Sequence, residues 1–345
     1  MKKFTLLTVF SLITALVLTS CSNDTPSDTD NTDVNILYSK IGALSSNTVF
    51  GLPSCINNGF IYYWGTDGYY EYDPEDKTSA KVFDPSETSS KEEGRRVCPE
   101  FNVVDNGFVA GENGKAYYLN YRGEVLSEFD FHECEFNEWV FAYEDRIFHT
   151  DYVFDTKSKK STRLFEERDV QYGFYYGLSS DCYFRVSLDD KSYEKISLKD
   201  KNAEAQTVKL PEEIERISGF AVDLNSDIYI SSSDEKGSKK LYKIAADNGE
   251  AEVVDIAADT IHFAVLNGNV AYMDYYVNGD NDNLYYNNIL VSDNAFRFTL
   301  LNEKYLIYTV QIITGTDEFG QLIYTEDVYL YDIEQGSTEQ LKTVT

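Results

Sequence analysis

Histidine, tryptophan, proline and methionine are all scarce in this sequence of 345 residues, which has 3 His, 2 Trp, 6 Pro and 2 Met. His132, His149 and His262 show neither the H-x-x-x-H nor the H-E-x-x-H spacing, so a metal-dependent hydrolase would lack its ligands. Trp64 and Trp139 are too few for a platform of several tryptophans that binds sugars. Neither the metal site of a hydrolase nor a sugar-binding platform of several tryptophans is therefore expected.

Sequence motifs of catalysis are missing as well. There is no G-x-S-x-G elbow for an acyl-transfer serine and no G-x-x-x-x-G-K-[ST] loop for nucleotide phosphates. Carboxylates are so abundant, at 59 Asp and Glu, that a pair at glycosidase separation would arise by chance. We assign no catalytic residue and no cofactor, and we expect a protein that binds rather than one that reacts.

Basic residues are outnumbered, with 30 Lys and Arg and a formal net charge of −29. Binding to nucleic acid needs clusters of Lys and Arg that displace counterions from the phosphates, so no nucleic-acid partner is expected. An acidic surface of this kind keeps a protein soluble and favours cations or basic partners. We expect a monomer.

The only long apolar run is residues 4–18, which follows Lys2 and Lys3. As a helix it would span about 22 Å, short of the ~30 Å hydrocarbon core, so it is typical of an export signal rather than a permanent span. The run closes with Leu18-Thr19-Ser20-Cys21, which resembles the lipobox of bacterial lipoproteins. The resemblance implies that Cys21 is acylated and becomes the mature N-terminus, since two or more acyl chains give stable anchoring. An ordinary cleaved secretory signal is the alternative.

Three segments follow from this leader. Residues 1–20 are the predicted lipoprotein signal peptide, and residues 21–33 are the lipidated cysteine and a flexible acidic tether without large apolar side chains. Residues 34–345 are the predicted folded domain. We expect an extracytoplasmic protein that is lipid-anchored to the cell membrane or the outer membrane.

The remaining cysteines are Cys55, Cys98, Cys134 and Cys182, without a CxxC pair or a Cys/His cluster. An exported chain could oxidise them, and four cysteines allow three pairings. Because all four lie in apolar, strand-like stretches, we favour unpaired thiols that pack as small hydrophobic side chains.

Aromatic residues are plentiful, at 15% of the chain with 28 Tyr and 21 Phe. Tyr, Phe, Val, Ile and Thr fit pleated sheets, and helical periodicity is hard to find. The best candidate for a helix is the short "PEEIER" at 211–216. The composition predicts an all-β chain.

One pattern recurs seven times: a turn of Asn, Asp and Gly, then three short strands separated by polar turns, each unit preceded by a further apolar strand. The clearest instance is "NNGFIYYWGTDGYYEYDPEDKTSAKVF". The units begin at Asn57, Asp105, Glu144, Ser180, Asn225, Asn267 and Asn302. Four strands in about 45 residues are typical of a propeller blade. We therefore predict a single β-propeller of seven four-stranded blades, with six or eight as alternatives. In a closed ring, residues 34–41 could add the outer strand of the last blade.

Pairs of adjacent tyrosines interrupt the alternation of apolar and polar side chains that a sheet with only one buried face would show. They are Tyr62-Tyr63, Tyr69-Tyr70, Tyr117-Tyr118, Tyr275-Tyr276 and Tyr285-Tyr286. Neighbouring strand residues face opposite sides, and a propeller blade has a neighbour on both sides, so both rings of a doublet can be buried. An aromatic platform for sugars is the alternative.

The segment "ISGFAVDLNSDIYIS", residues 217–231, looks like an NHL-type propeller repeat, with its Gly, its "AVD" triplet and its apolar-Tyr-apolar strand. The likeness covers one unit. The whole chain is similar to bacterial lipoproteins with TolB-like, NHL-like or low-density-lipoprotein-receptor-like propellers, and this resemblance implies a β-propeller and no particular site.

The oxygen-rich stretch "NGDNDN" at 278–283 is the one candidate metal site. Asp280, Asp282 and Asn283 could offer oxygen ligands to Ca²⁺, but the spaced D-x-D-x-D-G pattern and the distal Glu of a calcium loop are missing. A solvated hairpin turn begun by Asn-Gly is the expected structure, and a Ca²⁺ site is the alternative.

Two functions fit these observations. The first is a membrane-anchored propeller that acts as a non-catalytic binding platform for another envelope macromolecule, with specificity from loops such as 87–96, 231–240 and 312–321. The second is a glycan-binding or glycan-active surface protein that uses carboxylates and tyrosines at the propeller face. Identifying the bound partner as a protein or as a glycan would distinguish the two functions.

Overall fold

The computed structural model describes residues 54–65, 68–83, 101–104, 107–112, 115–120, 124–130, 140–168, 173–200, 202–256, 262–274, 282–317 and 319–341. All of these belong to one unit of the chain, Leu37–Thr345. They form strands and turns, and no helix among them is long and apolar enough to cross a membrane.

The described residues build seven four-stranded antiparallel sheets, each made of four consecutive strands. Blade 1 holds β1 (Ser54–Asn57), β2 (Phe60–Trp64), β3 (Tyr69–Asp73) and β4 (Thr78–Phe83). Blade 2 holds β5 (Phe101–Val104), β6 (Gly107–Glu112), β7 (Lys115–Asn120) and β8 (Val125–Asp130). Blade 3 holds β9 (Val140–Tyr143), β10 (Arg146–His149), β11 (Tyr152–Asp155) and β12 (Lys160–Arg163).

The second half of the ring continues in the same way. Blade 4 holds β13 (Phe174–Leu178), β14 (Cys182–Ser187), β15 (Ser192–Ser197) and β16 (Gln206–Lys209). Blade 5 holds β17 (Arg216–Val222), β18 (Ile228–Ser233), β19 (Lys239–Ile244) and β20 (Ala251–Val254). Blade 6 holds β21 (His262–Leu266), β22 (Asn269–Asp274), β23 (Asp282–Tyr286) and β24 (Ile289–Ala295). Blade 7 holds β25 (Arg297–Leu300), β26 (Tyr305–Thr316), β27 (Leu322–Asp332) and β28 (Ser337–Gln340).

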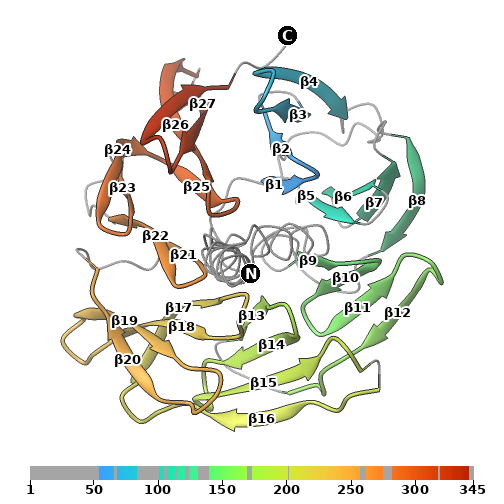
Figure 1. Ribbon diagram of the computed structural model, residues 1–345, viewed down its shortest axis with the longest axis vertical. Coiled ribbons are helices and arrows are strands. Elements are labelled where there is room, and N and C mark those ends of the chain that lie inside the picture. The colour runs from blue at the N-terminus through green and yellow to red at the C-terminus, as the bar shows by residue number, and fades with distance from the viewer. Residues whose placement is uncertain are drawn as a thin grey trace, which may run out of the picture. The chain divides into compact units, whose positions relative to one another are not determined.

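The sheets succeed one another around a ring, with the first strand of each sheet innermost (Figure 1). The inner strands lie against their neighbours, as in the pairs β1 with β5, β5 with β9, β13 with β17 and β17 with β21. This arrangement is a β-propeller. The all-β fold and the seven-unit repeat predicted from the sequence are confirmed, including the units that begin at Glu144 and Ser180.

Apolar packing between the first and the last blade closes the ring. Ile61 and Tyr63 of blade 1 share one buried cluster with Ile307 and Leu330 of blade 7. The outer strand of blade 7 is β28, which pairs with β27. The segment 34–41, suggested as the outer strand of this blade, lies outside the described residues, and its expected place is taken by β28.

The tyrosine doublets show why each blade is buried on both sides. Tyr63 and Tyr70 pack toward blade 7, whereas Tyr62 and Tyr69 pack toward blade 2 in a cluster with Leu119. All four of these rings are buried, so the prediction is confirmed for the first two doublets. In the doublets at 117–118 and 285–286 one ring is buried and the other half-buried, and the doublet at 275–276 lies outside the described residues.

Close approach of the inner strands needs a glycine at one position. A Cβ on Gly177 of β13 would come within 2.7 Å of Val222 Cγ2 and 2.9 Å of Phe220 Cε1, both on β17 of the next blade. These distances are too short for carbon atoms, so a larger residue would push blades 4 and 5 apart.

The segment 211–216, named above as the best candidate for a helix in an all-β chain, is not helical. This segment is a turn, in which the Ile214 N–H donates to the Pro211 carbonyl, and Arg216 already begins β17. Six residues are too few to repay the cost of nucleating a helix, and the buried Ile214 side chain packs between blades 4 and 5 instead.

Candidate functional site

The histidines lie apart in the ring. His149 is buried in β10, with its ring 5.7 Å from that of Tyr152. His262 begins β21, where burial and the nearby charge of Lys239 lower its pKa to about 4. His132 lies outside the described residues. The two described histidines come from blades 3 and 6, so they do not form one site.

No metal centre is found in the part of the chain that the structure describes: no three His, Cys, Asp or Glu side chains there are grouped to hold an ion. Asp282 and Asn283 lie in β23 rather than in a loop, and as neighbours in a strand they point to opposite faces. Asp280 lies outside the described residues, so the suggested Ca²⁺ site stays a prediction.

Cysteine chemistry is not favoured either. Cys182 is a free thiol in β14, and burial raises its pKa, which keeps it protonated and unreactive. Cys55 is buried in β1, as expected for a small hydrophobic side chain. Cys98, Cys134 and the predicted lipidation site Cys21 lie outside the described residues.

The aspartate of the "AVD" triplet ties two blades together. Asp223 is fully buried in the turn between β17 and β18, and its carboxylate accepts the backbone N–H groups of Asn267 and Gly268 at 2.7 and 2.8 Å. These two residues form the Asn-Gly turn between β21 and β22 of blade 6, with φ of 47° and 78°. The motif that resembles an NHL repeat therefore has a structural role in this chain.

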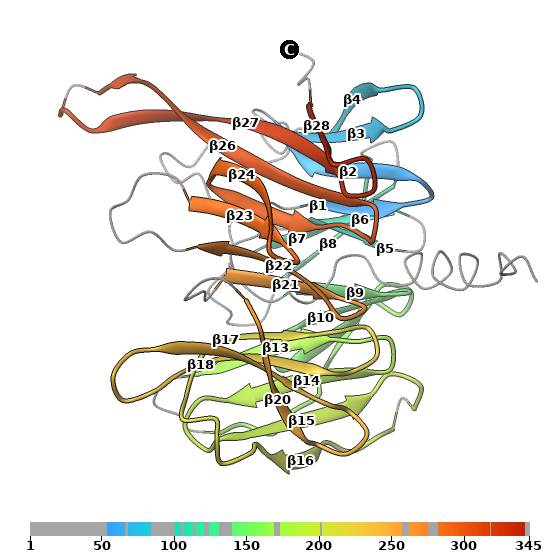
Figure 2. The same cartoon turned by 60° about the vertical axis from the view of Figure 1, so that its left-hand side comes forward.

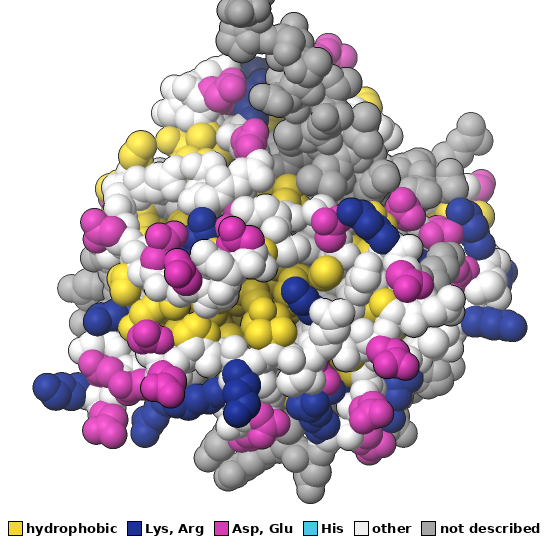
Figure 3. Space-filling view, turned by 60° about the horizontal axis from the view of Figure 1, so that its bottom comes forward, with side chains coloured by type: hydrophobic (Ala, Val, Ile, Leu, Met, Phe, Trp, Pro, Cys, Tyr) yellow, Lys and Arg dark blue, Asp and Glu magenta, His cyan; other side chains and the backbone are white. Residues whose placement is uncertain are grey.

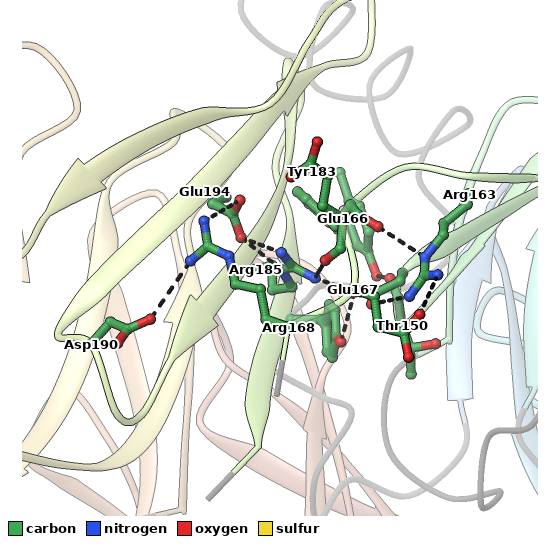
Figure 4. Close-up of polar contacts among 12 residues, drawn as sticks. Thr150, Arg163, Glu166, Glu167, Arg168, Tyr183, Arg185, Asp190 and Glu194 are labelled. Atoms are coloured by element: carbon green, nitrogen blue, oxygen red, sulfur yellow. Dashed lines mark hydrogen bonds and ion pairs between the residues drawn. The ribbon is translucent and has the colours of Figure 1, made fainter. Parts of the chain in front are cut away.

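The densest group of charges in the described residues lies at the junction of blades 3 and 4 (Figure 4). Arg185 of β14 stands opposite Glu194 of β15 in the strand register. Asp151 reaches the same point from the two-residue turn between β10 and β11, and the connector 164–168 passes beside it.

Arg185 is completely buried, and all three of its nitrogens are engaged. Its Nε and Nη2 donate to Glu194 Oε2 at 2.8 and 2.5 Å. Its Nη1 donates to Asp151 Oδ1 and to the Glu166 carbonyl, each at 2.9 Å. Partners of this kind offset the cost of removing a guanidinium from water.

Two aromatic rings hold the same guanidinium. The ring centroids of Phe165 and Phe174 lie 4.6 and 4.5 Å from Arg185 Cζ, which places the cation within the range of a cation–π interaction with both. Arg185 thus binds the connector between the blades as well as the strands, and it has no face left for a ligand.

Half-exposed arginines extend the network toward solvent. Arg168 contacts Glu194 Oε1 at 3.0 Å and Asp190 at 3.7 Å, and Arg163 contacts Glu167 at 3.2 Å. Their carboxylate partners are occupied within the network, so this cluster joins two blades rather than forming an active site. This cluster could not be predicted from the sequence, because its members come from separate units of the repeat.

The most unusual exposed surface is the outer half of the hairpin formed by β26 and β27, residues 310–328, which we call the arm. Figure 2 shows this hairpin projecting past the ends of the other strands. It carries a group of large apolar side chains that are between 40% and 81% exposed: Ile312, Ile313, Phe319, Ile323 and Tyr324. Residues 312–321 were expected to be a loop, but they are mostly strand and tip turn of this ribbon.

Other surfaces are more ordinary. On the side of blades 4 and 5, Figure 3 shows acidic and basic side chains intermingled around a band of hydrophobic ones. In the expected loop at 231–240, β18 runs to Ser233 and β19 begins at Lys239, which leaves only a short turn between them. The expected loop at 87–96 lies outside the described residues. The arm is therefore the candidate functional surface.

Comparisons with known proteins agree with the fold. No protein-family model and no curated protein matches the sequence. A puromycin hydrolase structure has a TM-score of 0.53 at 10% identity, with 87% of this chain aligned to 54% of that one. Dipeptidyl peptidase 4 of Porphyromonas gingivalis gives a TM-score of 0.41 at 10% identity, covering 90% of this chain and 55% of the other.

A third similar structure is PorZ, described as an essential surface component of the type-IX secretion system of Porphyromonas gingivalis. Its TM-score is 0.48 at 11% identity, with 88% of this chain aligned to 39% of PorZ. This chain spans about half the length of the two enzymes and less of PorZ. At these identities the likeness to the puromycin hydrolase shows a shared β-propeller fold and nothing of activity.

Proposed function

We propose that this chain is an extracytoplasmic lipoprotein whose β-propeller is a non-catalytic platform for binding another macromolecule of the cell envelope. The observation that carries the proposal is the arm, a projecting ribbon with five large apolar side chains in solvent. Exposed apolar groups of this kind are typical of surfaces that bind other molecules.

Two further observations support binding over catalysis. The buried charges at the junction of blades 3 and 4 are paired with one another, and the described histidines lie in different blades. The glycan-binding alternative required tyrosines at the surface, whereas both rings of the first two doublets are buried between blades. We therefore propose the binding platform alone.

Replacing Cys21 with serine tests the anchor. Serine cannot form the thioether to which the lipid is attached, so the variant is expected to leave the membrane fraction for the soluble extracytoplasmic fraction and to lose label from an alkyne fatty acid. Cell fractionation with immunoblotting measures this, and Cys182→Ser is the matched control, expected to stay in the membrane. A Cys21→Ser protein that stays membrane-bound and labelled would contradict the lipoprotein assignment.

Chemical cross-linking in intact cells, followed by purification and mass spectrometry, tests the platform itself. We expect one envelope protein to be linked in a fixed ratio to the lipoprotein. Recovery of lipid and cell-wall material without any protein would contradict the proposal and favour a ligand of another class.

A further inference from the structure

The arm is held by fewer strand pairs than the rest of blade 7. β25 pairs with β26 only from Leu306 to Thr309, and β28 pairs with β27 only from Tyr329 to Asp332. Within the described residues, the arm positions from Val310 to Thr316 and from Leu322 to Asp327 pair only with one another. A two-stranded ribbon without a third strand is marginally stable in water and has open edges.

Apolar side chains lie on both faces of this ribbon. Ile313 stands opposite Tyr324 on one face, and Ile312 and Ile323 lie on the other, so a fold that buried one face would leave the second in water. Phe319, at the tip, is 81% exposed. None of these side chains belongs to the buried clusters that the described residues form between blades, and binding is the role that explains their number.

The tip is ordered before any partner arrives. Asp317 Oδ1 accepts the N–H groups of Phe319 and Gln321, each at 2.8 Å, and Gly320 takes a φ of 78° that suits glycine. A partner would therefore meet a preformed ribbon, which lowers the entropic cost of binding.

The charge of the arm narrows the choice of partner. Its sequence contains Asp317, Glu318, Glu326 and Asp327 and no Lys or Arg. A second copy of the chain would bring the same negative charges to the contact, and anionic lipid headgroups would repel it as well. A partner with positive charges and apolar side chains is complementary to it.

The outer edge of β27 offers a place for such a partner. Among the described residues, pairing on this edge ends where the Leu341 N–H donates to the Val328 carbonyl at 2.8 Å. β27 continues beyond that point with Glu326, Tyr324 and Ile323. An added strand there would prolong the ladder that β28 begins.

We propose that the arm binds an extended polypeptide segment of alternating apolar and basic residues, which adds to the β27 edge as a further strand. This rests on the proposed binding function and names its partner class. Main-chain hydrogen bonds to the open edge supply affinity. Alternation supplies specificity, because the side chains of such a strand alternate between the two faces of the ribbon: the apolar ones lie beside Tyr324 on one face, and Lys or Arg lies beside Asp327 on the other.

Binding of two peptide pools to the full mature chain with Cys21→Ser tests the proposal. Both pools are fluorescent and alternate random apolar residues with charged ones, which are Lys or Arg in the first pool and Asp or Glu in the second. Fluorescence anisotropy is expected to show binding of the basic pool and at least about tenfold weaker binding of the acidic pool.

Two arm variants and one control sharpen the test. Ile313→Ser, Phe319→Ser and Tyr324→Ser together are expected to weaken binding of the basic pool at least about tenfold, because apolar anchors dominate such contacts. Glu326→Lys with Asp327→Lys is expected to shift the preference to the acidic pool. Ile289→Ser with Leu290→Ser, at exposed apolar positions of β24, is expected to leave binding unchanged.

Any of four results would overturn the proposal: neither pool binds, both pools bind equally, the arm variants bind like the parent, or phosphatidylcholine vesicles bind the parent but not the arm variants. The charge-reversal variant keeps the test valid should the triple variant fail to fold. If one of these results is obtained but cross-linking in cells still yields a protein partner, the proposed role of the arm is wrong and the proposed function as a binding platform is retained.

Discussion

Arg185→Ala is expected to lower the free energy of unfolding by about 3 to 5 kcal/mol, the usual cost of removing one partner from a buried ion pair. Glu194 would keep only Arg168 as a cationic partner, while Asp151 and the Glu166 carbonyl would lose their hydrogen bonds from Arg185. The phenyl rings of Phe165 and Phe174 would also enclose a cavity. Urea denaturation followed by tyrosine and tryptophan fluorescence measures the loss.

A control variant and a rescue variant distinguish the effect of leaving buried partners unpaired from the simple loss of a charge. Arg163→Ala, at the half-exposed end of the same network, is expected to leave the urea midpoint nearly unchanged. Arg185→Met combined with Glu194→Leu removes both charges while filling the space, and it is expected to recover most of the stability lost in Arg185→Ala. A double variant no more stable than Arg185→Ala would show that the ion pair itself supplies the stability, against our interpretation.

Ile307→Ala is expected to cost about 2 to 5 kcal/mol, the range found when large aliphatic side chains are truncated in a core. Ile307 has no exposed surface and lies in the cluster that joins blade 7 to blade 1. Its truncation leaves a cavity at the one junction where the ends of the ring meet. Thermal and urea denaturation of the variant measure the effect.

Lys77→Ala is the matched control, because Lys77 bridges the same two blades through a 2.7 Å contact with Glu339 at the surface. Its side chain is 66% exposed, so solvent and salt weaken the pair, and we expect a change within experimental error. Equal losses in the two variants would mean that the surface ion pair, rather than the apolar cluster, closes the ring.

The repeat could be predicted from the sequence because each blade consists of strands that follow one another directly in the chain. Short aromatic strands alternate with turns of Asn, Asp and Gly, and antiparallel neighbours in the chain pair with each other, so every unit predicts its own sheet. The buried doublets Tyr62-Tyr63 and Tyr69-Tyr70 followed from the same logic, because only a blade with two neighbours hides both rings.

What the sequence could not reveal depends on contacts between units. Arg185 meets Asp151 across 34 positions, and their proximity arises only when blade 4 packs on blade 3. The segment 211–216, the best candidate for a helix, is a turn because burial of Ile214 between two blades outweighs its local preference. The strands of the arm are the longest in the described residues, with 12 residues in β26 and 11 in β27, but nothing in their sequence says that the extra length lies outside the sheet.

Site-specific photo-cross-linking in intact cells tests the central claim most directly. A photoreactive amino acid is placed at Phe319, at the tip of the arm, and in a second strain at Ile289, an exposed apolar position of blade 6. We predict that Phe319 captures one envelope protein through an extended segment rich in Lys or Arg, and that Ile289 captures none. Capture of the same protein from both positions, or of no protein from Phe319, would contradict the account.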